Sequence, residues 1–226
     1  MSAAIGILAR APVSGLSKTR LIPAIGASRA ARLQRHLIDR TLSTACEAGV
    51  DRVVLYTEGD SGDGFGNDLR RRYPIGVRPQ RGADLGARMA DAMCALLAAH
   101  SRAVLIGTDC LTLTPLDLSD AAAALTQTRM VFAPAEDGGY VLVGARTFPE
   151  SVFQNIAWGG TTVMSDTRRR LRDAGWAFGR DWTERDTHWD IDRPADLRRA
   201  VAAGLLDSSW EIGRDMPVSR AHPVET

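Results

Sequence analysis

The chain has 226 residues, a formal net charge of +1 at pH 7, 45% hydrophobic residues and 24% charged residues. This length suits one α/β domain with a sizeable core, and the near-neutral charge argues against nucleic-acid or membrane-surface partners. Three cysteines without metal or redox spacing, and the absence of any apolar run of about 18 residues, predict a cytoplasmic protein with no membrane span.

The predicted elements alternate between short apolar runs, typical of buried strands, and longer segments with helical spacing. In chain order they are strand 3–9, helix 27–49 with Ser28 as N-cap, strand 52–57, loop 58–68, helix 84–100, strand 103–107, helix 116–127, strands 130–135 and 139–145, and helices 161–175 and 193–204. Because the strands are unbroken apolar runs, they predict a mostly parallel sheet covered by helices on both faces. Parallel sheets bind ligands at the carboxyl ends of their strands, so functional residues are expected directly after each strand.

The stretch RAPVSGLSKTRL, residues 10–21, follows the first strand. A Walker A loop needs glycines where Ser17 and Pro12 stand, so this is not one. Gly15 allows close backbone approach, and neighbouring N–H groups can form a nest for an anion. Lys18 and Arg20 supply the charges that suit a diphosphate. The alternative interpretation is a solvated basic loop.

Three aspartates occupy comparable positions elsewhere. Asp109 follows strand 103–107 and is expected either to hold Mg²⁺ or Mn²⁺ against phosphate oxygens or to cap a turn. Asp190 and Asp192 lie two apart in HWDIDRPADL, so an extended backbone points both to the same side. We expect Asp190 to be a metal ligand, and Asp192 to act partly as a ligand and partly as the cap of the helix near Pro194.

The segment QRGADLGARM, residues 80–89, ends a loop and opens a helix. Gln80 has the paired donor and acceptor groups that suit a base edge. Gly82 and Gly86 would let the backbone approach a flat ring. Arg88 is expected either to reach a phosphate or to cover the helix surface.

Two further segments offer contacts for a sugar or an acceptor. In APAEDGGYVL, Glu136 and Asp137 could receive hydroxyl groups, but Asp-Gly is also a strong hairpin signal, and the sequence favours that interpretation. In NIAWGGTTV, Trp158 is expected either to stack on a sugar ring or, by default, to lie partly buried in the core.

Five motifs, in order along the chain, resemble those of one family: ILARAPVSGLSKTRL, LIGTDCLTLT, FAPAEDGGYVLVG, WGGTTV and DIDRPADL. The chain resembles, from about Ile5 to Leu205, the GT-A-fold proteins once filed as a domain of unknown function and now termed arsenosugar-biosynthesis or selenodomain-associated glycosyltransferases. These belong to the nucleotide-diphospho-sugar transferase superfamily and are similar to molybdenum-cofactor and phospholactate guanylyltransferases. The resemblance implies a Rossmann-like three-layer α/β/α sandwich over residues 1–207. Residues 208–226 are expected to form a loosely attached tail.

The resemblance also implies roles for particular residues. Its nucleotide contacts are Ala9, Pro12, Gly15, Lys18, Arg20, Gln80, Gly82, Gly86, Arg88 and Asp109. Its sugar or acceptor contacts are Glu136, Asp137, Gly138, Gly139 and Trp158. The resemblance makes Asp109 a metal ligand and Asp190 or Asp192 a second one, so the predicted metal ligands are Asp109, Asp190 and Asp192. The predicted catalytic residues are Lys18, Arg20, Asp109 and Asp137. The family usually has Pro and an acidic residue after Asp-Cys, whereas Leu111 and Thr112 follow Cys110 here, which leaves one carboxylate at this point.

The leading hypothesis is metal-dependent glycosyl transfer from a nucleotide-sugar to a small-molecule acceptor, by a monomer or a homodimer. The metal, Lys18 and Arg20 would neutralise the departing diphosphate, and Glu136 or Asp137 would position the sugar or act as a base. A nucleotidyltransferase that uses GTP or CTP and releases pyrophosphate is the alternative. A third hypothesis is a protein that binds nucleotides without turnover.

Overall fold

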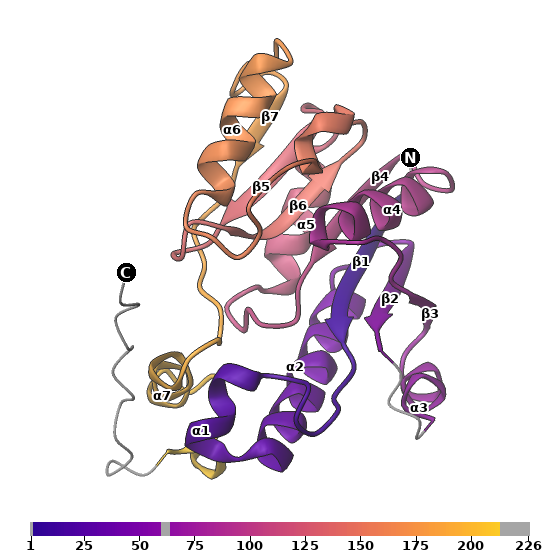
Figure 1. The fold of residues 1–226 in the computed structure, drawn as a ribbon. Helices are drawn as coiled ribbons and strands as arrows, with labels where there is room; N and C mark the ends of the chain where they lie inside the picture. The colour runs from indigo at the N-terminus through magenta and orange to yellow at the C-terminus, as the bar shows by residue number, and fades with distance from the viewer. Residues whose placement is uncertain (1, 60–63, 213–226) are drawn as a thin grey trace, which may run out of the picture.

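The computed structural model describes residues 2–59 and 64–212, which build a central sheet flanked by helices (Figure 1). Within these residues the sheet has seven strands in the order β3-β2-β1-β4-β6-β5-β7. The strands are β1 (Ala3–Arg10), β2 (Arg52–Glu58), β3 (Ile75–Pro79), β4 (Arg102–Ile106), β5 (Met130–Pro134), β6 (Tyr140–Ala145) and β7 (Trp182–Glu184). β6 runs antiparallel to β4 and β5, and the other pairings are parallel, which confirms the predicted mostly parallel sheet.

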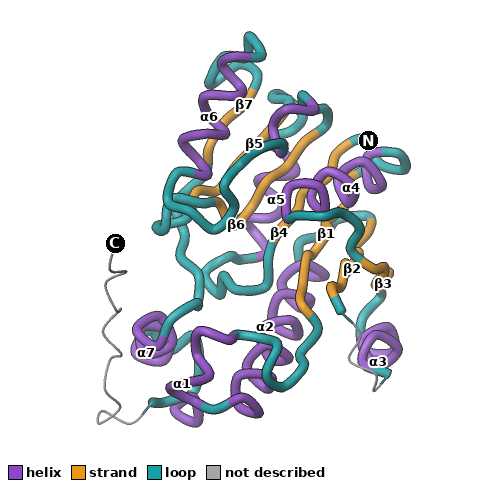
Figure 2. The backbone as a smooth tube through the Cα atoms, in the orientation of Figure 1, coloured by secondary structure: helices purple, strands orange, loops and turns teal. Residues whose placement is uncertain are grey.

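The helices form a layer on each face of the sheet (Figure 2). They are α1 (Ile22–Ile25), α2 (Ala27–Glu47), α3 (Phe65–Arg72), α4 (Leu85–Leu97), α5 (Pro115–Ala124), α6 (Val163–Asp173) and α7 (Pro194–Ala202), with 3-10 turns η1 (Thr19–Leu21), η2 (Glu150–Phe153) and η3 (Ser208–Trp210). α2, α3 and α5 cover one face, and α4 and α6 cover the other. None of the described helices has both the length and the apolar character needed to cross a membrane.

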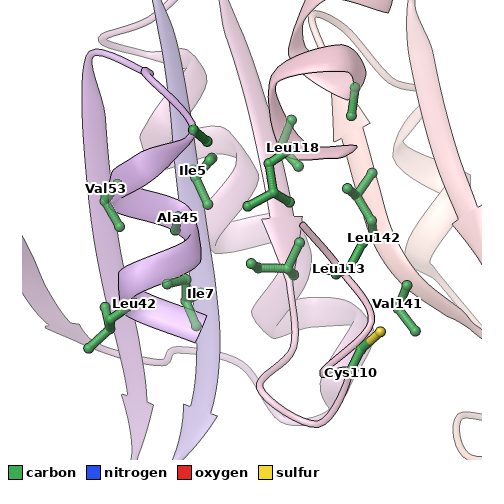
Figure 3. Packing of buried hydrophobic residues seen from close by; sticks show 14 of the residues in the cluster. Ile5, Ile7, Leu42, Ala45, Val53, Cys110, Leu113, Leu118, Val141 and Leu142 are labelled. Carbon is green, nitrogen blue, oxygen red and sulfur yellow. The ribbon is translucent and has the colours of Figure 1, made fainter. Parts of the chain in front are cut away.

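The core explains why the apolar runs become sheet strands. On one face Ile5 and Ile7 of β1 pack with Leu42 of α2 and Leu118 of α5 (Figure 3). A neighbouring residue of this strand, Ala4, belongs to the cluster on the opposite face. Each fully buried Leu or Ile side chain stabilises the fold by about 1.5–3 kcal/mol, so a strand that is apolar on both faces is most stable between two helix layers.

Some element boundaries differ from the prediction. α2 begins at Ala27 with Gly26 as its N-cap, at φ 77°, so the predicted cap role of Ser28 is wrong. The predicted loop 58–68 overlaps α3, which begins at Phe65; residues 60–63 lie outside the described part of the chain. α3 buries only Phe65 and Leu69 among charged neighbours, and two apolar anchors give too weak a periodicity to identify a helix.

The start of the predicted tail forms η3, and Ile212 is buried in a third apolar cluster with Leu33 of α2 and Leu197 of α7. Arg29 of α2 donates a hydrogen bond of 2.6 Å to the carbonyl oxygen of Ser209. The remainder of the predicted tail, residues 213–226, lies outside the described residues. The domain boundary at residue 207 stays a prediction.

Candidate functional site

A polar cavity of about 500 Å³ lies at the carboxyl ends of β1, β2 and β4. These strands are parallel neighbours, so their ends meet at one edge of the sheet. The residues that line this polar cavity are Leu8, Ala9, Arg10, Lys18, Thr19, Arg20, Gln34, Glu58, Gln80, Leu85, Arg88, Gly107, Thr108, Asp109, Gly159 and Asp192. Six of the predicted nucleotide contacts are therefore brought together, and Pro12, Gly15, Gly82 and Gly86 are not among the lining residues.

A tight turn after β1 presents Lys18 to this cavity. Ser17 is buried, and its hydroxyl donates a 2.8 Å hydrogen bond to the carbonyl oxygen of Val13. Gly15 has φ 83°, which this turn requires and which glycine adopts without strain. Lys18 itself has φ 50°, a left-handed backbone conformation. This conformation is uncommon for residues other than glycine, and such residues cluster at functional sites.

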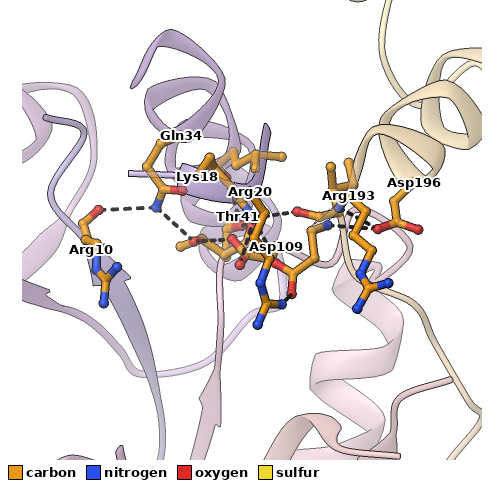
Figure 4. Close-up of polar contacts among 12 residues, drawn as sticks. Arg10, Lys18, Arg20, Gln34, Thr41, Asp109, Arg193 and Asp196 are labelled. Carbon is orange, nitrogen blue, oxygen red and sulfur yellow. Dashed lines mark hydrogen bonds and ion pairs between the residues drawn. The ribbon is translucent and has the colours of Figure 1, made fainter. Parts of the chain in front are cut away.

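The Lys18 side chain is only 5% exposed and lies between two carboxylates (Figure 4). Its ammonium nitrogen is 2.8 Å from Asp109 Oδ2 and 3.7 Å from Asp192 Oδ1, and it donates a 2.5 Å hydrogen bond to the Ile191 carbonyl oxygen. Arg20 Nη1 lies 2.9 Å from Asp192 Oδ2. The two predicted cations and two of the predicted acids therefore form one charged cluster, which excludes a purely solvated loop for Lys18.

The acids converge because residues 188–192 dock across the sheet edge. The His188 N–H donates to the Pro134 carbonyl at 2.9 Å, and the Ile191 N–H donates to the Asp109 carbonyl at 2.9 Å. This backbone pairing sets Asp190 and Asp192 on either side of Ile191, next to the end of β4.

The predicted cap role of Asp192 is wrong. The side chain that caps α7 is Asp196, whose Oδ2 accepts hydrogen bonds from the Arg193 N–H at 2.7 Å and the Asp192 N–H at 3.1 Å. In a capping box the side chain at the third helical position reaches back to the backbone N–H of the N-cap residue, and Asp196 occupies that position relative to Arg193. The Asp192 carboxylate is left to pair with Lys18 and Arg20.

Asp190 is the acid without a partner. No described residue donates a hydrogen bond to its carboxylate or forms an ion pair with it. Burial raises its pKa to about 7, the nearby Asp109 carboxylate adds to this effect, and Lys18 opposes it. Asp190 therefore carries unfavourable electrostatic energy that a bound cation would relieve.

The acids fit a hard divalent cation in part. No group of three His, Cys, Asp or Glu side chains within residues 2–59 and 64–212 forms a ready set of metal ligands. The reason is visible in the ion pairs, because Lys18 holds an oxygen of Asp109 while Lys18 and Arg20 hold Asp192. Asp190 remains as an unpartnered oxygen donor near Asp109, whose Oδ2 pairs with Lys18 and whose Oδ1 accepts a 3.1 Å hydrogen bond from Thr108 Oγ1. Carboxylate oxygens are the ligand type that Mg²⁺ and Mn²⁺ prefer, and such ions often complete their shells with phosphate oxygens and water.

Residues that the sequence analysis did not identify brace the polar cavity. Gln34 of α2 is 4% exposed, and its amide nitrogen lies 3.2 Å from the Arg10 carbonyl oxygen and 3.3 Å from Thr108 Oγ1. Glu58 at the end of β2 pairs with Arg88 at 2.8 Å and with Arg10 at 3.4 Å. A signal for Gln34 was present, since a polar residue sits among the buried positions of an amphipathic helix.

Gln80 has less freedom than its predicted role requires. Its amide nitrogen donates to the carbonyl oxygens of Ala9 at 2.9 Å and Tyr56 at 3.0 Å, which ties β1 to β2. Its side-chain oxygen is the atom left for a ligand.

Gly82 and Gly86 have a structural explanation that differs from the predicted approach to a flat ring. A Cβ on Gly82 would lie 2.7 Å from the backbone nitrogen of Arg88. A Cβ on Gly86 would overlap the Phe153 carbonyl oxygen and lie 2.8 Å from Trp158 Nε1. Both glycines therefore allow close packing within the chain. The lack of a side chain at Gly86 lets Trp158 pack against α4, and this packing position is called the seat of Trp158.

Replacing Gly86 with alanine is expected to destabilise the protein by about 1–2 kcal/mol, because the overlap exceeds the gain in helix propensity. The matched control is Gly66→Ala in α3, where a Cβ would meet only Val77 at an ordinary 3.5 Å. Chemical denaturation of both variants measures the difference. A Gly86→Ala protein as stable as Gly66→Ala would contradict the proposed seat.

Residues 135–139 form the hairpin turn between β5 and β6, as the Asp-Gly signal indicates, with an Ala135 N–H to Gly139 carbonyl bond of 3.0 Å. Within it Glu136 points to α7, where its carboxylate accepts two hydrogen bonds from Arg199 at 2.6 and 2.9 Å. Glu136 lines neither the polar cavity nor the two smaller cavities that adjoin it. Glu136 therefore lies outside the cavities that the other predicted site residues line.

Glu136→Gln is expected to leave turnover within about twofold of the unchanged protein and to shift the Tm little, since exposed ion pairs contribute little. Steady-state assays and a thermal melt provide the measurement. A large loss of turnover would restore Glu136 to the site.

The two smaller cavities, of about 160 Å³ each, adjoin the polar cavity through the shared residue Leu85. The Trp158 cavity is lined by Leu85, Met89, Asp137, Gly139, Tyr140, Trp158, Gly159, Gly160, Val163 and Asp190. The Leu105 cavity is lined by Leu8, Leu85, Met89, Leu105, Ile106, Gly107, Tyr140, Val141 and Val143. Gly138 lies behind the first of these, where a Cβ would overlap the Thr161 carbonyl oxygen.

Comparison with known proteins identifies a family and a similar solved structure. A family model described as "Uncharacterized protein conserved in bacteria (DUF2064)" matches residues 41–160, more than half of the chain. A Desulfovibrio desulfuricans G20 protein, provisionally classed as a nucleotide-diphospho-sugar transferase, is 27% identical with a TM-score of 0.80; the match covers 93% of this chain and 90% of that one. No curated protein sequence matches the chain.

Two more distant structures show the fold alone. The 4-diphosphocytidyl-2C-methyl-D-erythritol synthase from Anaerococcus prevotii DSM 20548 is 10% identical with a TM-score of 0.61, over 91% of this chain and 99% of that one. A cytidylyltransferase from Leptospira borgpetersenii is 12% identical with a TM-score of 0.58, over 92% and 89%. The three-layer α/β/α architecture is therefore that of the nucleotide-sugar transferase folds.

Proposed function

The chain belongs to the DUF2064 family of uncharacterized bacterial proteins, and from this membership and the charged cluster we propose that it is a transferase that uses a nucleotide-sugar donor. The observation that carries the proposal is the convergence of Lys18, Arg20, Asp109 and Asp192 on a cavity of about 500 Å³, with Asp190 lining the adjoining Trp158 cavity. The similarity to the D. desulfuricans protein supports the same class.

In this proposal the polar cavity binds the nucleoside diphosphate. Lys18 and Arg20 neutralise the charge that develops on the leaving diphosphate, an effect that is strong where water is excluded. Asp192 holds both cations in place before the donor arrives. Gln80 offers its side-chain oxygen to the nucleobase, and Arg88, fixed by Glu58, lies along the same wall.

Asp109 and Asp190 would hold a Mg²⁺ or Mn²⁺ ion. When bound, the ion supplies further stabilisation of negative charge on the leaving group. In this assignment the carboxylate of Asp190, which has no partner among the described residues, binds the ion. Asp192 keeps its ion pairs with Lys18 and Arg20.

Asp137 is our candidate base. It lines the Trp158 cavity, and its Oδ1 accepts a 2.9 Å hydrogen bond from the Gly139 N–H, which fixes the side chain and leaves Oδ2 free of a donor among the described residues. An acceptor hydroxyl gives its proton to this carboxylate and bonds to the anomeric carbon. The bond from that carbon to the diphosphate breaks, and the electron pair stays on the diphosphate oxygen.

The experiment is a panel of UDP-, GDP- and dTDP-sugars with Mg²⁺ or Mn²⁺ and hydroxyl acceptors, in which nucleoside diphosphate release is measured. Release that depends on an acceptor supports glycosyl transfer. Pyrophosphate release from GTP or CTP would instead establish the nucleotidyltransferase that is our second candidate, since the same cavity can hold a triphosphate. Thermal stabilisation by nucleotides without any release would contradict both and leave nucleotide binding alone.

A further inference from the structure

The three adjoining cavities differ in the charged side chains that line them. The polar cavity is lined by four cations, Arg10, Lys18, Arg20 and Arg88, and by three acids, Glu58, Asp109 and Asp192. The charged residues that line the Trp158 and Leu105 cavities are Asp137 and Asp190, and both are acidic. An anion therefore finds cationic side chains in the polar cavity, whereas the charged side chains among the described residues that line the two smaller cavities are all carboxylates.

The walls of the two smaller cavities are mostly apolar and are held in position. The Trp158 and Tyr140 rings are perpendicular, with centroids 6.3 Å apart, and Tyr140 also contacts Phe132 edge-on at 5.4 Å. Gly86 seats Trp158 against α4. Apolar walls with a few placed polar groups are the usual lining of a small-molecule site.

Because no cationic side chain is among the described residues that line the smaller cavities, we propose that these cavities take an uncharged group with an apolar face and a hydroxyl, and that they reject a phosphorylated or carboxylated one. The inference rests on the proposed function and narrows it, because the acceptor and the transferred sugar are then both without an anionic substituent. An acceptor whose phosphate is the nucleophile finds no Lys or Arg side chain among the described residues that line these cavities. Asp137 carries most of this discrimination, since Asp190 is expected to share a metal ion when the donor is bound.

Two matched probes test this, phenyl β-D-glucoside and phenyl phosphate. Each is titrated into the full chain saturated with UDP or GDP and Mg²⁺, and tryptophan fluorescence is recorded. The Trp158→Phe variant identifies the part of the signal that comes from the cavity. The glucoside is expected to change this signal, and phenyl phosphate is expected to bind at least tenfold more weakly, because like charges brought together oppose binding.

The charge is tested by Asp137→Asn, whose amide oxygen can still accept the Gly139 N–H. In this variant the ratio of the affinity for the glucoside to the affinity for phenyl phosphate is expected to fall at least threefold. The matched control is Asp173→Asn, at the exposed end of α6, which is expected to keep the ratio of the unchanged protein. Equal binding of the two probes, no response to the glucoside, or a preference unchanged by Asp137→Asn would each overturn the inference. Affinity for the nucleoside diphosphate is measured separately by calorimetry, so loss of the proposed function is distinguished from loss of this preference.

Discussion

Lys18→Met is expected to lower turnover about 10²–10³-fold and to weaken nucleoside diphosphate binding, because it removes the buried cation at the centre of the charged cluster. The same change leaves Asp109 and Asp192 without their shared partner, so a loss of about 1–3 kcal/mol in stability is also expected. Steady-state kinetics, calorimetry with UDP or GDP, and chemical denaturation measure the three effects.

Lys18→Arg separates charge from geometry. Lys18 is the only lysine in the sequence, and every other Lys or Arg position is an arginine. The lysine at position 18 therefore departs from the strong use of arginine in the rest of the chain. A compact ammonium group reaches Asp109 and the Ile191 carbonyl at 2.8 and 2.5 Å, and a planar guanidinium group cannot occupy the same point. We therefore expect Lys18→Arg to retain most of the stability but little turnover. The exposed Arg71→Met is the matched control, and turnover of Lys18→Met within tenfold of the unchanged protein would refute the assignment.

Asp190→Asn is expected to stabilise the protein at pH 8 while reducing metal-dependent turnover at least a hundredfold. The pKa of Asp190 is raised from 3.8 to about 7, so the folded state binds this proton more tightly than the unfolded state does. Stability is accordingly full below about pH 4 and falls as the pH rises toward 7. Each pKa unit corresponds to about 1.4 kcal/mol, which sets a ceiling of about 4 kcal/mol on the gain from removing the charge.

Urea denaturation at pH 4 and pH 8 tests the sign of this effect. The two proteins should have similar stability at pH 4, and Asp190→Asn should be the more stable at pH 8, whereas Asp173→Asn should show no such dependence. Mg²⁺ should raise the Tm of the unchanged protein at pH 8 more than that of Asp190→Asn, because a ligand of the folded state stabilises it. If Asp190→Asn were less stable at pH 8 than the unchanged protein, the ionised Asp190 carboxylate would not destabilise the folded state, and the prediction would be wrong.

The sequence by itself determined five of the seven strands in the described residues and the residues that come directly after them. Apolar runs such as AAIGILA identify β1 because burial on both faces is a local property of residue type, and they place Lys18, Arg20 and Asp109 at strand ends before any contact is known. Ordered motifs along the chain likewise identified the family. The sequence analysis missed β3, the short β7 and the weakly apolar α3, because too few of their residues are buried to leave a pattern.

Only the tertiary structure decided which of those residues meet. Asp190 reaches Asp109 because the Ile191 N–H pairs with the Asp109 carbonyl, a contact between residues 82 positions apart that no local spacing encodes. Glu136 and Asp137 are neighbours in sequence, yet one binds Arg199 and the other lines the Trp158 cavity, since the hairpin turn directs adjacent side chains apart. Gly86 was expected to approach a ligand, and in the structure it packs against Trp158. A glycine in the sequence indicates that some group comes close to the backbone, but it does not identify that group.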